Sequence, residues 1–127
     1  MTLDRKFLLC ALVYAVFGIC VGIYMAASEN HSQLVAHAHI LLVGFVVSFV
    51  YGLIHKLWVA AESQIVAHVQ FYLHQFAALA MASGLLLFYG GVHPPLLEQI
   101  LKASSLGILV SALLMVYLVI KSPREKT

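Results

Sequence analysis

The sequence carries very little charge. Only 9% of its 127 residues are Asp, Glu, Lys or Arg, whereas 63% are hydrophobic, and the mean hydropathy is +1.00. A water-soluble domain of this size needs far fewer apolar residues, so the composition excludes that class. The net charge of +2 is also too small to form a basic surface, so we expect no nucleic-acid partner.

Cysteine is nearly absent as well. Cys10 and Cys20 are the only two, and both lie in one apolar run. Ten residues of helix separate them by about 15 Å, which is too far for a disulfide within the chain. We interpret them as small buried apolar residues that say nothing about the redox compartment.

Long hydrophobic runs, in contrast, are abundant. Four can be marked, at roughly 7–27, 34–58, 65–89 and 96–120. Each is long enough to cross about 30 Å of hydrocarbon as a helix, and short links make sequential helices antiparallel neighbours. The first run also follows the plan of a signal peptide, but it exceeds a usual signal core, which favours a span. We therefore predict one all-α domain over residues 1–127, an integral membrane four-helix bundle surrounded by the lipid bilayer.

Basic residues indicate the orientation of the bundle. If the helices alternate, six of the seven basic residues fall on one side and only Lys102 falls on the other. Lys and Arg concentrate in cytoplasmic segments of membrane proteins. We predict cytoplasmic N- and C-termini in a multi-pass protein of a bacterial inner membrane. The six residues are Arg5, Lys6, Lys56, Lys121, Arg124 and Lys126.

Three histidines stand in the very apolar segment QLVAHAHILLVGFVVSFVYGLIHKLW, which spans residues 33–58. An imidazole in hydrocarbon is costly unless it is bonded. His37 and His39 are about 200° apart on a regular helix, so they face opposite ways and cannot bind one metal ion together. His55 returns to the face of His37 but lies about 27 Å further along, so it belongs to a different site.

Three interpretations of His37 and His39 remain open from the residues alone. They can be structural groups that bond neighbouring helices, ligands of dissociable copper or zinc on a transport path, or axial ligands of haem iron. His74 is well inside the third run and is either a site residue or an interhelical hydrogen-bonding group. The other histidines are expected in loops (His31 and His93) or near the membrane–water boundary (His55 and His68).

Haem suits this pattern on chemical grounds. Two neutral imidazoles fill the axial positions of haem iron, and its apolar macrocycle fits between membrane helices. Gly44 is seven residues after His37, so on a regular helix it shares that face and leaves room for the macrocycle. The sequence contains no CxxCH motif, which excludes covalently attached haem.

The segment VAHAHILLVGFVVSFVYGLIHKLW resembles a histidine-bearing helix in the catalytic subunit of haem–copper oxidases and nitric oxide reductases. HVQFYLHQFAALAMASG resembles the helix that follows, so the likeness covers about half of the chain. In that family the two histidines of a His-x-His pair ligate different haems from opposite faces. The resemblance implies that His37 and His39 are axial ligands of haem. Gly44, from its position on the His37 face, and His74, as a candidate site residue of the third run, complete the predicted haem b site.

The chain also departs from that family. The family's copper site uses three histidines, including an adjacent pair, and no adjacent His-His pair occurs here. Oxygen reduction of the oxidase type is therefore not expected. The family's subunit is built from three similar arcs of helices, each comparable to this chain, so a trimer of this chain could copy the ring.

We therefore predict a membrane b-type haem protein with bis-histidine iron that transfers electrons, between quinol and an outer electron-transfer protein. Because His37 and His39 face apart, each haem would take one imidazole from each of two subunits of a homo-oligomer, a trimer in preference to a dimer. One alternative is gas binding, of nitric oxide or oxygen, at an open haem site. The other is a non-haem scaffold, assembly factor or metal-permeation subunit.

Overall fold

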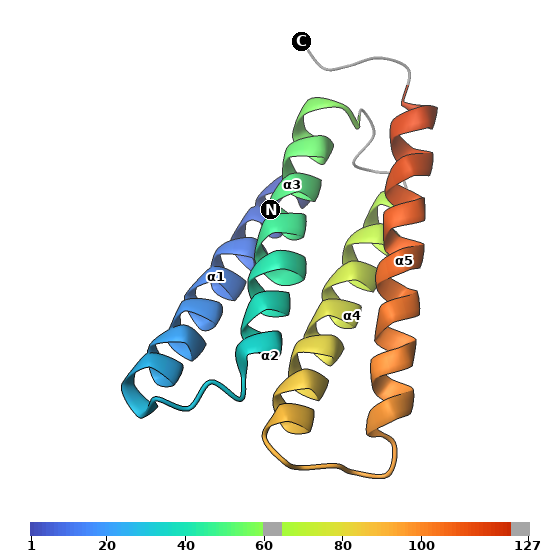
Figure 1. The fold of residues 1–127 in the computed structure, drawn as a ribbon. Coiled ribbons are helices and arrows are strands. Elements are labelled where there is room, and N and C mark those ends of the chain that lie inside the picture. The colour runs from blue at the N-terminus through green and yellow to red at the C-terminus, as the bar shows by residue number, and fades with distance from the viewer. Residues whose placement is uncertain (60–64, 123–127) are drawn as a thin grey trace.

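The computed structural model describes residues 1–59 and 65–122, and these parts form helices joined by short links (Figure 1). Within these residues, four helices are long and apolar enough to cross a membrane, as expected for the predicted all-α class. The helical segments are α1 (Leu3–Ser28), α2 (Leu34–His39), η1 (Ile40–Val46), α3 (Val47–Leu57), α4 (Ile65–Tyr89) and α5 (Leu97–Lys121). The segments α2, η1 and α3 follow one another without a break and make up the second span.

Each of the two fully described links has a residue in the left-handed backbone region at or near its start. Glu29 ends α1 with φ 55°, and Gly91, two residues after the end of α4, has φ 82°. Glycine adopts this conformation without strain, which is why it is common just after a helix. Pro94 and Pro95 precede α5. The residue before a proline is biased away from helical geometry, which favours a helix start after Pro95.

The helices pack as two antiparallel hairpins that meet along the second span and α4. At the end where α1 begins, one core cluster draws on α1, α3, α4 and α5, centred on Phe7, Tyr51 and Phe71. Nearer the opposite end a second cluster joins α1, η1 and α4 through Val21, Ile40 and Ala82. Many large apolar side chains on the outside of the bundle are exposed, as lipid contact requires.

Glycines line the seam between α1 and the second span. A Cβ on Gly18 would collide with Cδ2 of Leu41, and one on Gly44 would stand 2.6 Å from Cδ1 of Tyr14. Small residues let membrane helices approach this closely, and contact between helices in lipid depends on such packing. At this seam the glycines therefore serve the close packing of α1 against the second span.

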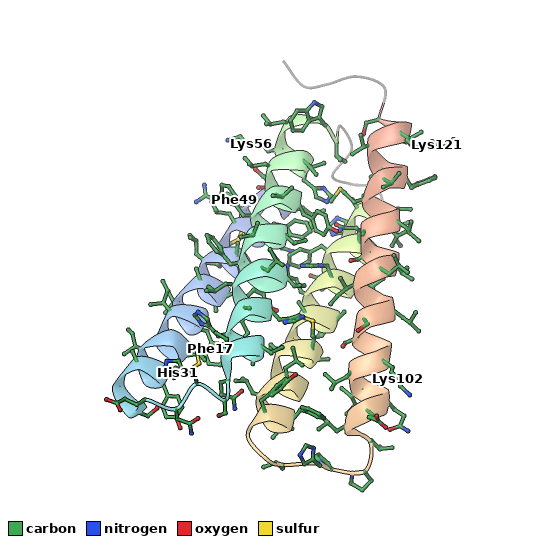
Figure 2. The ribbon with its side chains drawn as sticks, in the orientation of Figure 1. Phe17, His31, Phe49, Lys56, Lys102 and Lys121 are labelled. Carbon is green, nitrogen blue, oxygen red and sulfur yellow. The ribbon has the colours of Figure 1, made fainter. Side chains whose placement is uncertain are left out.

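Basic side chains gather at one end of the bundle. Lys56 and Lys121 lie near the end shared by α3 and α5, whereas Lys102 and His31 lie toward the other end (Figure 2). The start of α1, with Arg5 and Lys6, belongs to the same end as Lys56 because α1 and the second span are antiparallel. This distribution is the one used above to orient the chain, although Arg124 and Lys126 fall outside the described residues.

The surroundings of two single residues were not predicted. His55 lies in the last turn of α3 but is 0% exposed, because its ring stacks on Phe7 with centroids 5.1 Å apart. Cys20, expected to be buried, is exposed on the outer face of α1. His31 and His93 do lie in links, as predicted.

Candidate functional site

The second span changes its helical form directly after the His-x-His pair. Residues Ile40–Val46 form a π-helix, η1, and the N–H of Val47 bonds to the carbonyl of Leu42, five residues earlier. π-helical segments are rare and occur often at functional sites. Where the chain returns to α-helical bonding, one carbonyl receives no backbone N–H. If the N–H of Ser48 bonds to the carbonyl of Gly44, the carbonyl without a backbone donor is that of Val43.

His37 faces α1. Its Nδ1 lies 2.8 Å from the carbonyl oxygen of Gly18, and its Cε1 stands 3.0 Å from the position that a Cβ on Gly22 would take. Glycines four residues apart on α1 therefore create the groove in which the ring lies. The ring is partly buried in this contact between α1 and α2.

His39 lies on the other flank of the same short helix. Its Nδ1 is 2.8 Å from the carbonyl oxygen of Val35, one turn earlier, so the ring is held by its own helix and not by a neighbour. The ring is partly exposed, and the apolar side chains Leu42 and Val46 that follow it are exposed as well. His37 bonds to α1 and His39 bonds to its own helix, which agrees with the prediction that the two rings face different surroundings. Regular helix geometry applies to the pair because both residues belong to α2 and precede the π-helix.

The two histidines share one hydrogen-bonding pattern. A carbonyl oxygen can only accept, so Nδ1 of His37 and Nδ1 of His39 must each carry the proton. Within residues 1–59 and 65–122, Nε2 of each ring makes no hydrogen bond. A neutral imidazole whose Nδ1–H donates to a carbonyl, with a lone pair left on Nε2, is the usual state of a histidine that binds a metal through Nε2.

Gly44 is buried on the same side of the second span as His37, since both face α1. The ring of Tyr14 occupies the space above it, and the hydroxyl of Tyr14 donates to the carbonyl of Gln75 on α4 at 3.4 Å. In this structure the room that Gly44 provides is therefore used for helix packing.

His74 is fully buried near the middle of α4 and bridges to the π-helix. Its Nε2 donates to the carbonyl oxygen of Val43 at 3.2 Å, which is the carbonyl that the return to α-helical bonding at Ser48 would pass over. Its Nδ1 lies 3.5 Å from the hydroxyl of Ser111 on α5, and its ring meets Tyr51 edge to face with centroids 5.0 Å apart. His74 thus satisfies a backbone group that would otherwise be buried without a donor.

A second buried polar contact ties α3, α4 and α5 together. Nε2 of His55 donates to Oε1 of Gln70 at 3.2 Å, and the amide of Gln70 donates to the carbonyl of Ser111 at 3.3 Å. All three residues are 0% exposed. Sequence reasoning missed this contact, although Gln70 in an apolar run is a signal, because a polar side chain in a membrane helix almost always bonds within the bundle.

These histidines remain too dispersed to share one metal ion. Among the residues that the structure describes, no group of three or more His, Cys, Asp or Glu side chains comes together. A non-haem centre with that number of ligands has no candidate in those parts of the chain. Haem iron requires only axial ligands from protein, and the free Nε2 atoms of His37 and His39 match that requirement.

Comparisons with protein-family models, with curated proteins and with solved structures give no match to this chain. The resemblance of the second and third spans to haem–copper oxidases therefore stays a prediction. Residues 1–59 and 65–122 contain four candidate membrane spans, and His37, His39 and His74 have distinct hydrogen-bonding partners within these helices.

Proposed function

We propose that this chain is a membrane b-type haem protein that transfers electrons, and that His39 is an axial ligand presented to a haem between copies of the chain. The observation that carries the proposal is the state of His39. Its Nδ1 is fixed by the carbonyl of Val35, its Nε2 is unbonded within the described residues, and its ring is partly exposed on the flank away from α1. A purely structural histidine in lipid gains little from leaving a polar nitrogen without a partner.

The surroundings of His39 suit an apolar macrocycle. Val35, Leu42 and Val46 stand before and after it with 36%, 59% and 42% of their surfaces exposed. A flat apolar group on this flank would cover these side chains, and the carbonyl of Val35 would hold the imidazole plane and raise its basicity as a ligand. When bound, a bis-histidine haem supplies a one-electron couple and leaves no iron position for substrate. That favours electron transfer, with a quinol or an electron-transfer protein as partner, over gas binding.

The second ligand defines the assembly. In a ring of three copies, His39 of one copy and His37 of the next would serve one iron, which gives one haem per chain. In a twofold dimer, His39 of both copies would serve a single haem, and His37 would stay in its contact with Gly18 and Gly22. The ring is the arrangement that the family resemblance favours, and the ratio of haem to chain distinguishes the two.

The test is the absorption spectrum of protein purified after expression with ample haem. We expect a Soret band and sharp reduced α and β bands in the wild type, and loss of bound haem or conversion to a high-spin form in His39→Ala. His55→Ala and His93→Ala are the matched controls and should keep the spectrum. His37→Ala should lose haem in the ring and keep it in the twofold dimer.

Two outcomes would overturn the proposal. Colourless wild-type protein would favour the non-haem alternative of a scaffold or assembly factor, in which the imidazoles only join helices. Unchanged low-spin haem in His39→Ala would remove the proposed ligand. Native mass spectrometry in mild detergent then counts chains and haems together, with three of each expected for the ring.

A further inference from the structure

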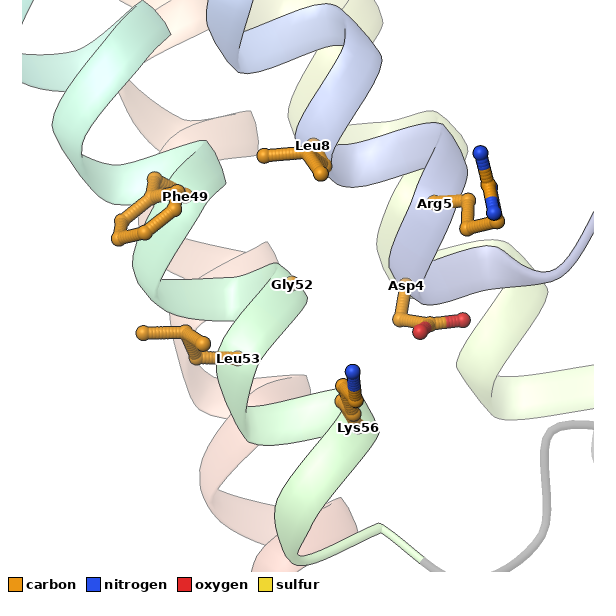
Figure 3. Close-up of a pocket in the computed structure, with 7 residues that line it drawn as sticks. All are labelled: Asp4, Arg5, Leu8, Phe49, Gly52, Leu53 and Lys56. Carbon is orange, nitrogen blue, oxygen red and sulfur yellow. The ribbon is translucent and has the colours of Figure 1, made fainter.

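A charged cleft lies between the first turns of α1 and the last turns of α3. Its volume is about 280 Å³. Figure 3 shows Lys56 extending from α3 toward Asp4 at the start of α1, whereas the Arg5 side chain points away from α3 at the rim of the cleft. The lining residues are Asp4, Arg5, Leu8, Phe49, Gly52, Leu53 and Lys56. None of the histidines discussed above lines this cleft, so it is a separate site.

Close contact of the two helices forms the base of the cleft. A Cβ on Gly52 would stand 3.0 Å from Phe7 Cβ and 3.3 Å from the backbone carbonyl oxygen of Asp4. Neither of these atoms can move without displacing α1, so the base is rigid. Above it the walls are apolar and open to the surroundings, since Leu8 and Leu53 are each 41% exposed.

The charges of the cleft favour an anion. Arg5 and Lys56 contribute two positive charges and Asp4 contributes one negative charge, which leaves one net positive charge among the lining residues. Arg5 and Lys56 are exposed. Lys56 lies at the same end of the bundle as Lys121 (Figure 2), and Arg5 lines the same cleft as Lys56. Such an end faces the cytoplasmic leaflet under the positive-inside rule, and that leaflet carries anionic lipids.

We propose that this cleft binds an anionic phospholipid, with the phosphodiester headgroup between Arg5 and Lys56 and an acyl chain along Leu8, Phe49 and Leu53. One net positive charge matches the single negative charge of a phosphodiester. The guanidinium of Arg5 supplies a planar pair of donors for phosphate oxygens, and the ammonium of Lys56 supplies a point charge. Apolar walls directly beside two cations match an amphiphile, whereas a free anion would gain nothing from them.

The chain contains its own reporter for this site. Trp58 is the only tryptophan, and it follows Lys56 by two residues at the C-terminal end of α3. In bilayers of phosphatidylcholine, we would add brominated phosphatidylglycerol or brominated phosphatidylcholine at equal mole fractions and measure quenching of Trp58. Wild-type protein should be quenched more strongly by the brominated anionic lipid.

Variants assign the preference to the cleft. Lys56→Gln should lower the apparent preference for the anionic lipid about fivefold, and Arg5→Gln by a similar factor, given the typical contribution of one cation at an anionic surface. Lys56→Arg should retain it. Lys121→Gln is the matched control, because Lys121 lies at the same end on α5 and does not line the cleft. Far-UV circular dichroism confirms that each variant is folded.

Three results would overturn the proposal. An unchanged preference in Lys56→Gln would remove the site, and an equal loss in Lys121→Gln would show a diffuse surface attraction. Relief of the quenching by millimolar inorganic phosphate would show a site for free anions. The experiment needs no haem, so its result and that of the haem test are independent.

Discussion

Replacement of His74 by phenylalanine tests what the buried imidazole on α4 does. Phenylalanine is similar in size to the imidazole and should keep its edge-to-face contact with Tyr51. In the wild type the ring centroids of His74 and Tyr51 are 5.0 Å apart. It removes the bond from Nε2 to the carbonyl of Val43, which is 3.2 Å long. The contact with Ser111 is a minor loss, because it is 3.5 Å long and the Ser111 hydroxyl also donates to the carbonyl of Ile108 at 2.9 Å.

The expected cost follows from the carbonyl left behind. A buried acceptor without a donor costs about 1–3 kcal/mol, and measured interhelical bonds in a membrane protein reach at most about 1.7 kcal/mol. We therefore expect His74→Phe to lower the free energy of unfolding by about 1–2 kcal/mol. His74→Ala should cost more, about 3 kcal/mol, because it also leaves a cavity beside Tyr51.

Equilibrium unfolding in mixed micelles, with increasing mole fraction of dodecyl sulfate, measures this cost by circular dichroism and Trp58 fluorescence. His93→Phe is the control, because His93 is exposed in the link before α5 and should change stability by less than about 0.5 kcal/mol. A His74→Phe variant as stable as the wild type would refute the role assigned to the Val43 bond.

The absorption spectrum of the same variant separates the two interpretations of His74. If its role is the interhelical bond, His74→Phe should keep low-spin haem bound by other histidines. If His74 is itself a ligand, that variant should lose haem or become high-spin. The loss of haem in His74→Phe together with normal stability would therefore contradict the structural role on both counts.

Two further predictions concern packing and orientation. Gly52→Val should separate α1 from α3 and lower the free energy of unfolding by about 1–3 kcal/mol, because the nearest neighbours of the added carbons are Phe7 Cβ and the backbone carbonyl of Asp4. Cys20→Val, at an exposed site on α1, should have little effect in the same micelle assay. A reporter fused after Thr127 should show a cytoplasmic C-terminus, and a periplasmic result would contradict the orientation inferred from the basic residues.

The positions of the spans could be predicted because they depend on one quantity, the length of an apolar run. The predicted run at 65–89 coincides with α4, and the run at 34–58 ends one residue beyond α3. The start of α1 at Leu3 was missed by four residues, since Asp4, Arg5 and Lys6 are charged and the apolar criterion ignores them. A charged first turn is nevertheless compatible with a helix whose end lies in the headgroup region.

The partners of individual side chains could not be predicted in this way. His55 lies near the end of its helix, but its burial depends on Phe7 and Gln70 from two other helices, which its place in the sequence does not reveal. The opposed directions of His37 and His39 were predictable because they follow from helix geometry within one short segment. The carbonyl to which each ring bonds was not predictable, because it depends on the side-chain rotamer and on how closely α1 approaches α2.

The π-helix has a consequence for how the chain can change. A π segment holds one more residue than the α-helical path between the same two points, so the residues before it are turned by about 100° relative to an uninterrupted helix. If Ile40–Val46 became α-helical with all of its residues kept, His37 would turn away from the groove at Gly22, while the contacts of α3 with Phe7 would stay where they are. If one residue of Ile40–Val46 were lost in the same change, His37 would keep its direction. The direction of the histidine pair relative to α3 therefore depends on the helical form of Ile40–Val46 together with the number of residues in it.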